Sequence, residues 1–322
     1  KNRVRINSSG IIDPTFNNQN TDSNDRLSSI QIQSDGTFLG CFSVYTQTDF
    51  IIRHSFMRLD ANGFVINNKQ LLTTTKVDKI VKKSDSEIMV IGSSDFSFNL
   101  YHNGIKLTDQ NGNLMYNNNL KAPLNANYNI KDAVVQPDGK ILFVGKLPQN
   151  ATGNLMRLNS DFSTDSSFVL GAELTSLTCS EPQLQTDGKI LAICKGMISG
   201  NTINRVIRLN SDGSIDPSFA LGQGASGFSA ETRGIAILPD GKILVCGIFN
   251  AYNGVAKKGI VRLNTDGTID NGFDLPSISW FTVTVPEMAV QSDARIIIST
   301  SDFGLYRLNS DGTVDTSFTN PT

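Results

Sequence analysis

Short apolar stretches that follow a tight turn recur along the whole chain. In one of them, residues 243–246, every position is apolar, and a Pro-Asp-Gly turn lies just before it. Runs of about four to eight apolar residues bounded by turn residues are typical of buried strands. A strand that is buried on both faces needs covering sheets on both sides. The pattern therefore predicts an all-β protein of stacked sheets, and we find no stretch with helical periodicity.

Two kinds of β-hairpin alternate along the chain. In the first, called here the Arg hairpin, a basic residue precedes an Asn-x-Asp-Gly turn and an Asp follows it, as in Arg262 and Asp270. In the second, the apolar hairpin, a turn of the Pro-Asp-Gly-Lys type leads into an apolar strand. Arg hairpins recur roughly 50 residues apart, as in a repeat protein, at Arg5, Arg58, Lys106, Arg157, Arg208, Arg262 and Arg307. The apolar hairpins lie between them, with the turn residues Asp35, Asp85, Asp138, Asp187, Asp240 and Asp293.

The turn of each hairpin has residues suited to a tight connection. In the clearest copy, Pro presets φ, Asp suits the next position, and Gly241 can adopt the left-handed conformation of a glycine bulge. In the Arg hairpin, a loop of this length places Arg262 opposite Asp270. We interpret such pairs as cross-strand ion pairs that fix the register, and not as a ring of binding charges. In two repeats Ile66 and Leu114 replace the Asp, which a functional ring would not tolerate.

Two hairpins together make a four-stranded sheet, and such sheets stacked around an axis bury both faces. We therefore predict a six-bladed β-propeller of four-stranded antiparallel blades, because six apolar hairpins are present. The alternative is seven blades with one incomplete, because the Arg hairpins number seven. The extra copy, at Arg5 or Arg307, either completes the last blade as a closure hairpin or begins a further unit. We expect residues 1–322 to form a single domain within a longer polypeptide.

Several motifs in these hairpins carry a family resemblance. They are Gln-Pro-Asp-Gly-Lys-Ile-Leu from Gln136, Leu-Pro-Asp-Gly-Lys-Ile-Leu from Leu238, Phe-Asn-Ala-Tyr-Asn-Gly-Val from Phe249, and Arg-Leu-Asn-x-Asp-Gly-x-x-Asp-x-x-Phe in the Arg hairpins. With these motifs the chain resembles the delta-60 repeat family of bacterial and phage β-propellers. The resemblance covers nearly the whole chain and is strongest in the last three repeats. It implies a propeller in an extracellular or virion setting, and it implies no catalytic motif.

Charge and composition narrow the range of partners. The formal net charge is −2 without a block of like charge, so the chain lacks the basic face that nucleic acid binding requires. No apolar run is long enough for a membrane span, and we expect no membrane insertion. Three of the four cysteines fall in the same strand of different repeats, and no pair has CxxC spacing. We expect buried, reduced thiols rather than disulfides or a zinc site at Cys41, Cys179, Cys194 and Cys246.

The residues that usually carry catalysis are sparse. The two histidines, His54 and His102, have no Ser, Cys or carboxylate partner at a motif spacing. No GxSxG, HExxH or phosphate-binding glycine loop is present, so we expect neither an enzyme nor a cofactor. Calcium is an alternative, because residues 210–216 resemble an acidic calcium loop. Such a loop needs more oxygen ligands and a late Glu, and its Asp216 is already assigned to Arg208.

Aromatic residues in the variable loops are the candidate ligand-binding residues. One pair stands in a connection between two repeats, one cluster lies in a loop of the second repeat, and two tyrosines lie in comparable loops. Exposed aromatic rings with polar neighbours suit sugar stacking or a protein contact. The alternative is that these rings cap the core at the ends of the blades. The candidates are Trp280, Phe281, Phe96, Phe98, Tyr101, Tyr45 and Tyr252.

We therefore predict a non-enzymatic recognition or adhesion module that binds a glycan or a protein receptor through loops at its rim. The abundance of Asn, Ser and Thr and the low Lys content suit an extracellular or virion setting, such as a phage tail, a tail fibre or a bacterial surface protein. One alternative is a purely structural docking domain that contacts neighbouring subunits of a larger assembly. Another is a carbohydrate-active enzyme, which would need carboxylates that converge near the axis.

Overall fold

A computed structural model of the chain divides into two compact units. Unit 1 comprises Lys1–Arg5, Ile12–Ala151 and Leu155–Ser166, and unit 2 comprises Ile6–Ile11, Thr152–Asn154 and Ser167–Thr322. The first Arg hairpin is therefore shared, because its turn belongs with unit 2 and its two ends with unit 1. The structure describes residues 4–16, 26–46, 51–71, 75–94, 105–113, 115, 129–146, 154–198, 200–275, 285, 287–300 and 304–320.

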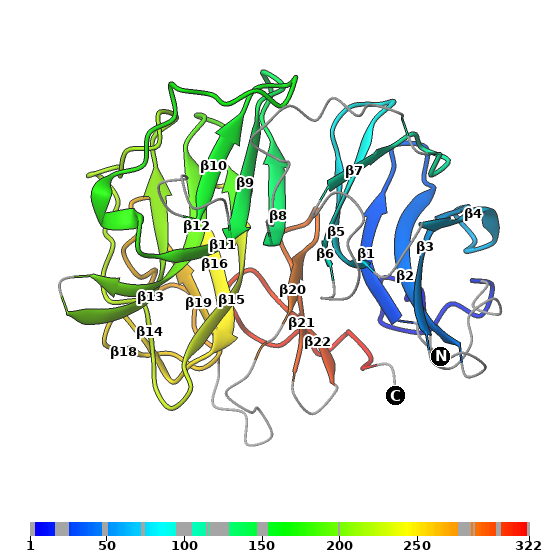
Figure 1. The fold of residues 1–322 in the computed structure, drawn as a ribbon. Helices are drawn as coiled ribbons and strands as arrows, with labels where there is room; N and C mark the ends of the chain where they lie inside the picture. The colour runs from blue at the N-terminus through cyan, green and yellow to red at the C-terminus, as the bar shows by residue number, and fades with distance from the viewer. Residues whose placement is uncertain are drawn as a thin grey trace. The chain divides into compact units, whose positions relative to one another are not determined.

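Unit 1 consists of antiparallel strands, drawn in blue to green in Figure 1. Its sheets have the strand orders β1-β2-β3-β4, β5-β6-β7 and β10-β9-β8. The strands are β1 (Arg26–Ile32), β2 (Phe38–Thr46), β3 (Ile51–Leu59), β4 (Val65–Leu71), β5 (Thr75–Lys82), β6 (Ile88–Ser94), β7 (Ile105–Thr108), β8 (Asn129–Val135), β9 (Ile141–Lys146) and β10 (Leu155–Leu158).

Unit 2 repeats the same pattern in the sheets β11-β12-β13, β15-β16-β19 and β20-β21-β22, and adds a small sheet, β14-β17-β18. A 3₁₀ turn, η1 (Ala172–Leu174), precedes the first of these sheets. The strands are β11 (Thr178–Leu184), β12 (Ile190–Ile198), β13 (Asn201–Leu209), β14 (Ala225–Ser226), β15 (Glu231–Ile237), β16 (Ile243–Ile248), β17 (Ala251–Tyr252), β18 (Val255–Ala256), β19 (Ile260–Leu263), β20 (Met288–Val290), β21 (Ile296–Ser299) and β22 (Leu305–Leu308).

In four repeats the fourth strand is reduced to a single antiparallel bridge across the Arg hairpin. These bridges are Leu158–Thr164, Leu209–Ile215, Leu263–Ile269 and Leu308–Val314. By contrast, β4 pairs with β3 over several residues, so the first sheet has four full strands. The predicted all-β architecture of antiparallel sheets is thus confirmed, and these sheets have three or four strands where four were predicted. The number of blades stays a prediction.

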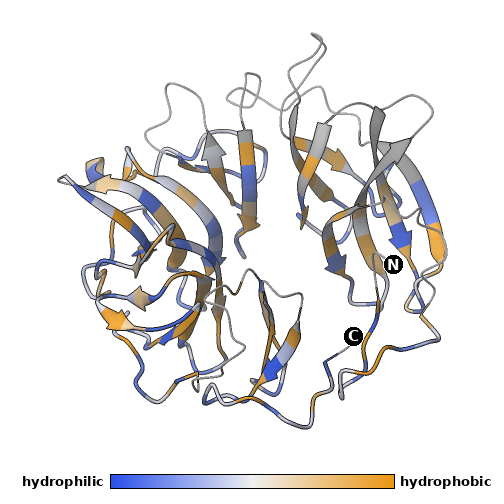
Figure 2. Cartoon of the chain, turned by 90° about the horizontal axis from the view of Figure 1, so that it is seen from below, coloured by the Kyte–Doolittle hydropathy of each residue, from blue (hydrophilic) through white to orange (hydrophobic). Residues whose placement is uncertain are grey.

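The core of each unit lies between successive sheets, whose buried apolar residues form shared clusters. Figure 2 shows hydrophobic and hydrophilic segments along the strands. Residues Ile243, Leu244, Val245 and Cys246 of β16 are all fully buried. Leu244 and Cys246 pack towards β21, whereas Ile243 and Val245 pack in the cluster that contains β12. The prediction that this strand is covered on both faces is therefore confirmed.

The Asp-Gly turns form as the sequence predicts. At the turn of β15 and β16, the amide of Gly241 donates to the carbonyl of Leu238 at 2.9 Å, and the amide of Leu238 donates to Lys242 at 2.8 Å. Gly241 has φ +82°, the left-handed conformation that only glycine adopts without strain. In the last apolar hairpin Ala294 takes the equivalent place with φ +64°, so the turn geometry persists where the glycine is lost.

The predicted cross-strand ion pairs are confirmed, and each has a second cation. Arg262 Nε lies 2.7 Å from Asp270, and Lys242 Nζ from the neighbouring apolar hairpin lies 2.8 Å from the same carboxylate. Burial would raise the pKa of Asp270, but the hydrogen bonds from Lys242, the Gly272 amide and Arg262 outweigh it and hold this pKa at about 2. The same arrangement recurs in the pairs Arg157–Asp165, Arg208–Asp216 and Arg307–Asp315. The side chains of these pairs are at most 11% exposed, which fits a role in the register and not in ligand binding.

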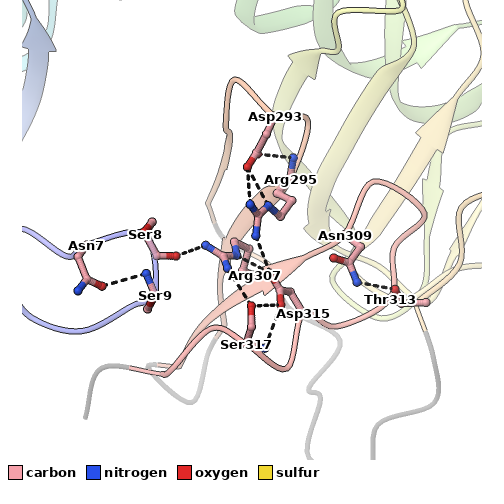
Figure 3. Close-up of polar contacts among 10 residues, drawn as sticks. All are labelled: Asn7, Ser8, Ser9, Asp293, Arg295, Arg307, Asn309, Thr313, Asp315 and Ser317. Carbon is pink, nitrogen blue, oxygen red and sulfur yellow. Dashed lines mark hydrogen bonds and ion pairs between the residues drawn. The ribbon is translucent and has the colours of Figure 1, made fainter.

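A contact that we call the Arg clasp links each Arg hairpin of unit 2 to the next one. Arg208 Nη1 donates to the carbonyl of Thr265, and Arg262 donates to that of Ser310. Arg307 makes the same contact with Ser8 of the N-terminal hairpin (Figure 3). Backbone hydrogen bonds connect the same pairs of hairpins. The amide of Ala220 donates to the carbonyl of Asp266 at 2.6 Å, and the amide of Thr319 donates to the carbonyl of Ser9 at 2.7 Å. The first Arg hairpin, at Arg5, thus occupies the next place after the hairpin of Arg307.

Candidate functional site at the loop end of unit 2

Two kinds of connection lie at opposite ends of the strands. The Asp-Gly turns lie at one end. At the other, which we call the loop end, lie the β12–β13 turn, the loop of residues 249–259, and the connector of residues 221–230 that leads into β15. The antiparallel register requires this grouping, because β12 and β16 both run away from the Asp-Gly turns. Loops on a rigid scaffold commonly carry binding function.

Asn253 attaches the connector to the neighbouring loop. Its side-chain oxygen accepts from the amide of Gly224 at 2.7 Å, and its own amide donates to the carbonyl of Gly224 at 2.8 Å. Arg205 on β13 adds a bond from Nη1 to the carbonyl of Gly222 at 2.5 Å. A Cβ at Gly222 would lie 2.2 Å from the side-chain oxygen of Asn253, so glycine is required there. The start of the connector is therefore fixed by specific contacts.

Asn204 fixes the other end of the connector. Its side-chain nitrogen donates to the carbonyl of Ala230 at 2.9 Å, and its side-chain oxygen accepts from the amide of Thr232 at 3.2 Å. The hydroxyl of Thr232 returns a bond to the carbonyl of Asn204 at 3.3 Å. Between the two attachments, the amide of Asn250 donates to the carbonyl of Ser226 at 3.0 Å. The connector is thus held along its length.

Phe228 stands out from this fixed connector. Its side chain is 94% exposed, the largest exposure among the large apolar side chains of the described residues. Gly227 before it has φ +129°, and Ser229 after it has φ +54°. These unusual backbone angles turn the chain so that the phenyl ring faces solvent instead of the core. The only signal for this residue in the sequence is weak: it is a lone aromatic residue in the segment Gly-Gln-Gly-Ala-Ser-Gly-Phe-Ser.

Charged groups lie close to the end of the connector. Glu231, the first residue of β15, accepts from Arg233 at 3.0 Å and lies 3.5 Å from Lys195. Burial would raise the pKa of Glu231, but the hydrogen bond from Arg233 and the two positive charges lower it below its ordinary value. Glu231 is therefore a carboxylate at neutral pH. The site combines an apolar ring with amides, hydroxyls and paired charges, which is the mixture found in polar recognition surfaces.

The sequence-predicted site residues fall into three groups. Tyr252 lies in β17 at the loop end, yet it is buried, and its hydroxyl accepts from the amide of Val206 at 3.2 Å. Burial raises its pKa to about 12. The centroid of this ring lies 5.7 Å from that of Phe249, so the ring is part of the packing under the loop. The sequence had predicted an exposed ring instead. The backbone of Tyr45 pairs with Ile52 in β2 and β3. Outside the described residues lie Trp280, Phe281, Phe96, Phe98 and Tyr101.

The expectation of four reduced thiols is wrong for two of them. Cys179 on β11 lies directly across from Cys194 on β12, and the two form a disulfide. Cys41 and Cys246 are buried thiols outside this disulfide, and burial raises the pKa of each to about 12. Thiols with such pKa values are protonated at neutral pH and are poor nucleophiles.

The calcium-like loop uses its oxygens internally. Asp212 accepts from the amide of Ser214 at 2.9 Å and from its hydroxyl at 2.6 Å, while Asp216 is held by Arg208 and Lys189. Across the described part of the chain, no group of three or more His, Cys, Asp or Glu residues is placed to hold a metal ion. Nor do these residues include a helix that is long and apolar enough to cross a membrane.

Comparison with protein families matches four repeats of this chain. The family is described as "Domain of unknown function (DUF5122) beta-propeller", and it matches residues 136–168, 185–219, 238–273 and 291–318. The chain carries β-propeller repeats. Each matched segment of the propeller begins at the turn of an apolar hairpin and ends near the Phe of the following Arg hairpin. The family unit thus coincides with the repeat defined by the turns and the ion pairs.

Solved structures with the same kind of fold are only distantly related to this propeller. Puromycin hydrolase matches with a TM-score of 0.51 and 13% identity, over 90% of this chain and 46% of that one. A protein of unknown function from Bacteroides caccae matches with a TM-score of 0.48 and 13% identity, over 81% of this chain and 88% of that one. At these identities the likeness concerns the fold alone. The comparison with curated proteins gave no match.

Proposed function

We propose that this propeller is a non-enzymatic recognition module that binds a glycan or a protein receptor through its loop end. The observation that carries the proposal is Phe228, an exposed ring on a connector that Asn204 and Asn253 hold at both ends. A held backbone lowers the conformational entropy that is lost on binding, and an exposed aromatic ring gives a large contact area. Its neighbours Ser226, Asn250 and Ser229 supply hydrogen-bonding groups of the kind that sugars and polar protein surfaces use.

The setting that we propose is extracellular or virion-borne, as in a phage tail, a tail fibre or a bacterial surface protein. The disulfide between Cys179 and Cys194 supports an oxidising compartment, because such bonds are rare in reducing ones. The buried thiols are protonated and the carboxylates of the Arg hairpins are paired with cations, so these groups are poorly suited to catalysis. This supports a non-enzymatic role. We also propose that the chain belongs to the delta-60 repeat family, because its hairpins carry the motifs that resemble this family.

The test is a glycan-array and whole-cell binding screen with the purified chain and its Phe228→Ala variant. We expect the variant to lose at least tenfold in affinity for any ligand found, since aromatic anchors often contribute 2 kcal/mol or more, on the order of a factor of 30. Val169→Ala, another exposed apolar residue of unit 2 at 64%, is the matched control. Equal melting temperatures would confirm that both variants fold. Undiminished binding by Phe228→Ala would refute this assignment of the site.

A further inference from the structure

In most Arg hairpins, the Arg is held by a carboxylate of the same hairpin. In the sheet β10-β9-β8, Oδ2 of Asp165 lies 2.6 Å from Nε of Arg157 and 3.1 Å from Nζ of Lys140. Gln136, two residues before the turn Asp, accepts from Nη1 of the same Arg at 3.4 Å. An Arg and a second cation likewise hold the carboxylates of Asp216, Asp270 and Asp315.

The second repeat has lost both members of this pair. In the register of its strands, Leu107 takes the place of the Arg. The amide of Met115 donates to the carbonyl of Leu107 at 3.0 Å, as that of Asp270 donates to Arg262 at 2.9 Å. Met115 therefore takes the place of the Asp, and both places lie one residue later than the sequence pattern indicated. Losing the Arg and the Asp together leaves no buried charge unpaired.

The first repeat has lost only the Asp. Leu59 pairs with Val65 in the same bridge that precedes the Asp in the other repeats, so Ile66 takes the place of that Asp. The side chain of Ile66 is 54% exposed. Arg58 remains, and its side chain is only 18% exposed. A guanidinium that is covered to this extent needs acceptors, because it has lost much of its contact with water.

The acceptors that Arg58 finds are weaker than a buried carboxylate of its own hairpin. Nη2 of Arg58 lies 2.7 Å from Asp35, whose carboxylate is 51% exposed and belongs to the turn of the apolar hairpin. Nε donates to the hydroxyl of Thr37 at 3.3 Å. In the four repeats with a second cation, Nε instead has a carboxylate at 2.6 to 2.7 Å. Hydrogen bonds to an ionised acceptor are shorter and stronger than those to a neutral one.

Gln33 adds a donor that has no acceptor. It is the counterpart of Gln136, two residues before the turn Asp, and it is 8% exposed. Its backbone amide donates to the carbonyl of Thr37 at 2.8 Å, so it lies across the turn from the residue that Arg58 contacts. Its side-chain nitrogen is buried and has no hydrogen-bond partner among the residues that the structure describes. A buried donor without an acceptor lowers stability, so a further acceptor here would be favourable.

We propose that this end of the sheet β1-β2-β3-β4 binds a small carboxylate, such as acetate or formate, in the place that the Asp side chain takes in other repeats. Nε of Arg58 and the side-chain nitrogen of Gln33 would donate to its two oxygens. The planar donors of a guanidinium match the geometry of a carboxylate. The small exposed fractions of both residues favour a small anion over a large one. Asp35 already offsets one positive charge, so the binding is weak.

The site lies within one unit of the chain. Its residues all belong to the segment Ile12–Ala151 of unit 1. They are Gln33, Asp35, Thr37, Arg58 and Ile66. The site is separate from the loop end of unit 2, so it does not rest on the function proposed there.

Two variants at one position test the site. Ile66→Asp supplies the carboxylate from the chain itself, whereas Ile66→Asn has nearly the same shape without the charge. We expect about 100 mM acetate at pH 7 to raise the melting temperature of the parent chain and of Ile66→Asn by roughly 2 °C over chloride at equal ionic strength. Ile66→Asp should melt higher than the parent chain without acetate and should lose this response. The same response in both variants would overturn the proposal.

The side-chain Nε–H signals of the arginines give a second readout in the parent chain. In an acetate titration followed by proton–nitrogen correlation spectra, we expect the Arg58 signal to shift with a Kd of roughly 1–50 mM. Arg262 is the matched control, because its Nε already has Asp270 at 2.7 Å, and its signal should stay in place. Arg58→Lys and Arg262→Lys assign the two signals. An Arg58 signal that does not move up to about 200 mM acetate would refute the site, and it would show that Gln33 turns its side-chain oxygen to Arg58, as Gln136 does in its repeat.

Discussion

The carboxylates of the Arg hairpins show how much one residue can depend on two elements. Asp270 receives Arg262 from its own hairpin, and it receives Lys242 from the turn of the apolar hairpin. The spacing of Arg and Asp along the sequence predicted the first partner, because a short loop fixes which residues face each other. It did not predict the second, because the side chain of Lys242 arrives from another strand and its reach depends on the register of the sheet.

The low pKa of Asp270 makes stability depend on acid pH. Its pKa falls from 3.8 to about 2 on folding, so the contribution of the ionised group is fully present above pH 3.8 and disappears as the pH falls through about 2. We expect Asp270→Asn to lower the free energy of unfolding by about 2–3 kcal/mol at pH 7. The difference from the parent chain should shrink between pH 4 and 2 in urea titrations.

Asp274→Asn is the control for this prediction, because the carboxylate of Asp274 is 76% exposed and binds Lys257 at the surface. We expect it to change the free energy of unfolding by less than about 0.5 kcal/mol. A constant deficit of Asp270→Asn at every pH would show that shape, and not ionisation, sets the role of this residue.

At the scale of elements, the repeated features were predictable and the singular ones were not. Hairpins, turns and ion pairs recur, so the period itself identifies them. Phe228 occurs once, in a connector whose shape depends on Asn204 and Asn253, and no period marks it. The pairing of Cys179 with Cys194 was missed for a related reason. Cys41, Cys194 and Cys246 share one strand position in different repeats, and this pattern indicates thiols that lie far apart. Cys179 lies on the strand next to that of Cys194, within the same repeat.

The disulfide should contribute measurably to the stability of unit 2. It closes a sequence separation of 15 residues, for which loop closure gives about 3 kcal/mol. We expect reduction by dithiothreitol, or the double change Cys179→Ala and Cys194→Ala, to lower the melting temperature in calorimetry. Thiol titration in denaturant should find two thiols per chain, those of Cys41 and Cys246. Four titrating thiols in the oxidised protein, or a melt that reductant leaves unchanged, would contradict the cross-strand bond.

At the scale of the whole molecule, the N-terminal hairpin is a partner of the C-terminal segment. Thr319 donates its amide to the carbonyl of Ser9, and Arg307 binds Ser8, so the last repeat needs the first Arg hairpin. The sequence predicted a surplus Arg hairpin but left its role open between closing the last blade and beginning another unit. The choice depends on contacts between segments roughly 300 residues apart, which no local pattern encodes.

A change at Gly10 tests this long-range contact. Gly10 has φ +85°, and a Cβ there would lie 2.0 Å from the carbonyl oxygen of Thr319. Gly36 has φ +78° with nothing within 4 Å of its Cβ position, so Gly36→Ala carries the same backbone strain without a clash. We expect Gly10→Ala to cost about 1–3 kcal/mol more than Gly36→Ala in urea unfolding. It should also expose the C-terminal segment to limited proteolysis. Equal effects of the two changes would argue against the contact.

The Arg clasp has a direction, and this has a consequence for self-association. The hairpins of Arg262 and Arg307 each donate from the Arg to the turn of the next hairpin and accept from the one before, so the donor side and the acceptor side are different surfaces. An interface of this kind is heterologous, whereas a two-fold dimer needs a patch that matches itself. Two chains cannot pair symmetrically by bringing two donor sides together. An Arg hairpin of another molecule can therefore use this contact only in a head-to-tail arrangement, in the place of the next Arg hairpin.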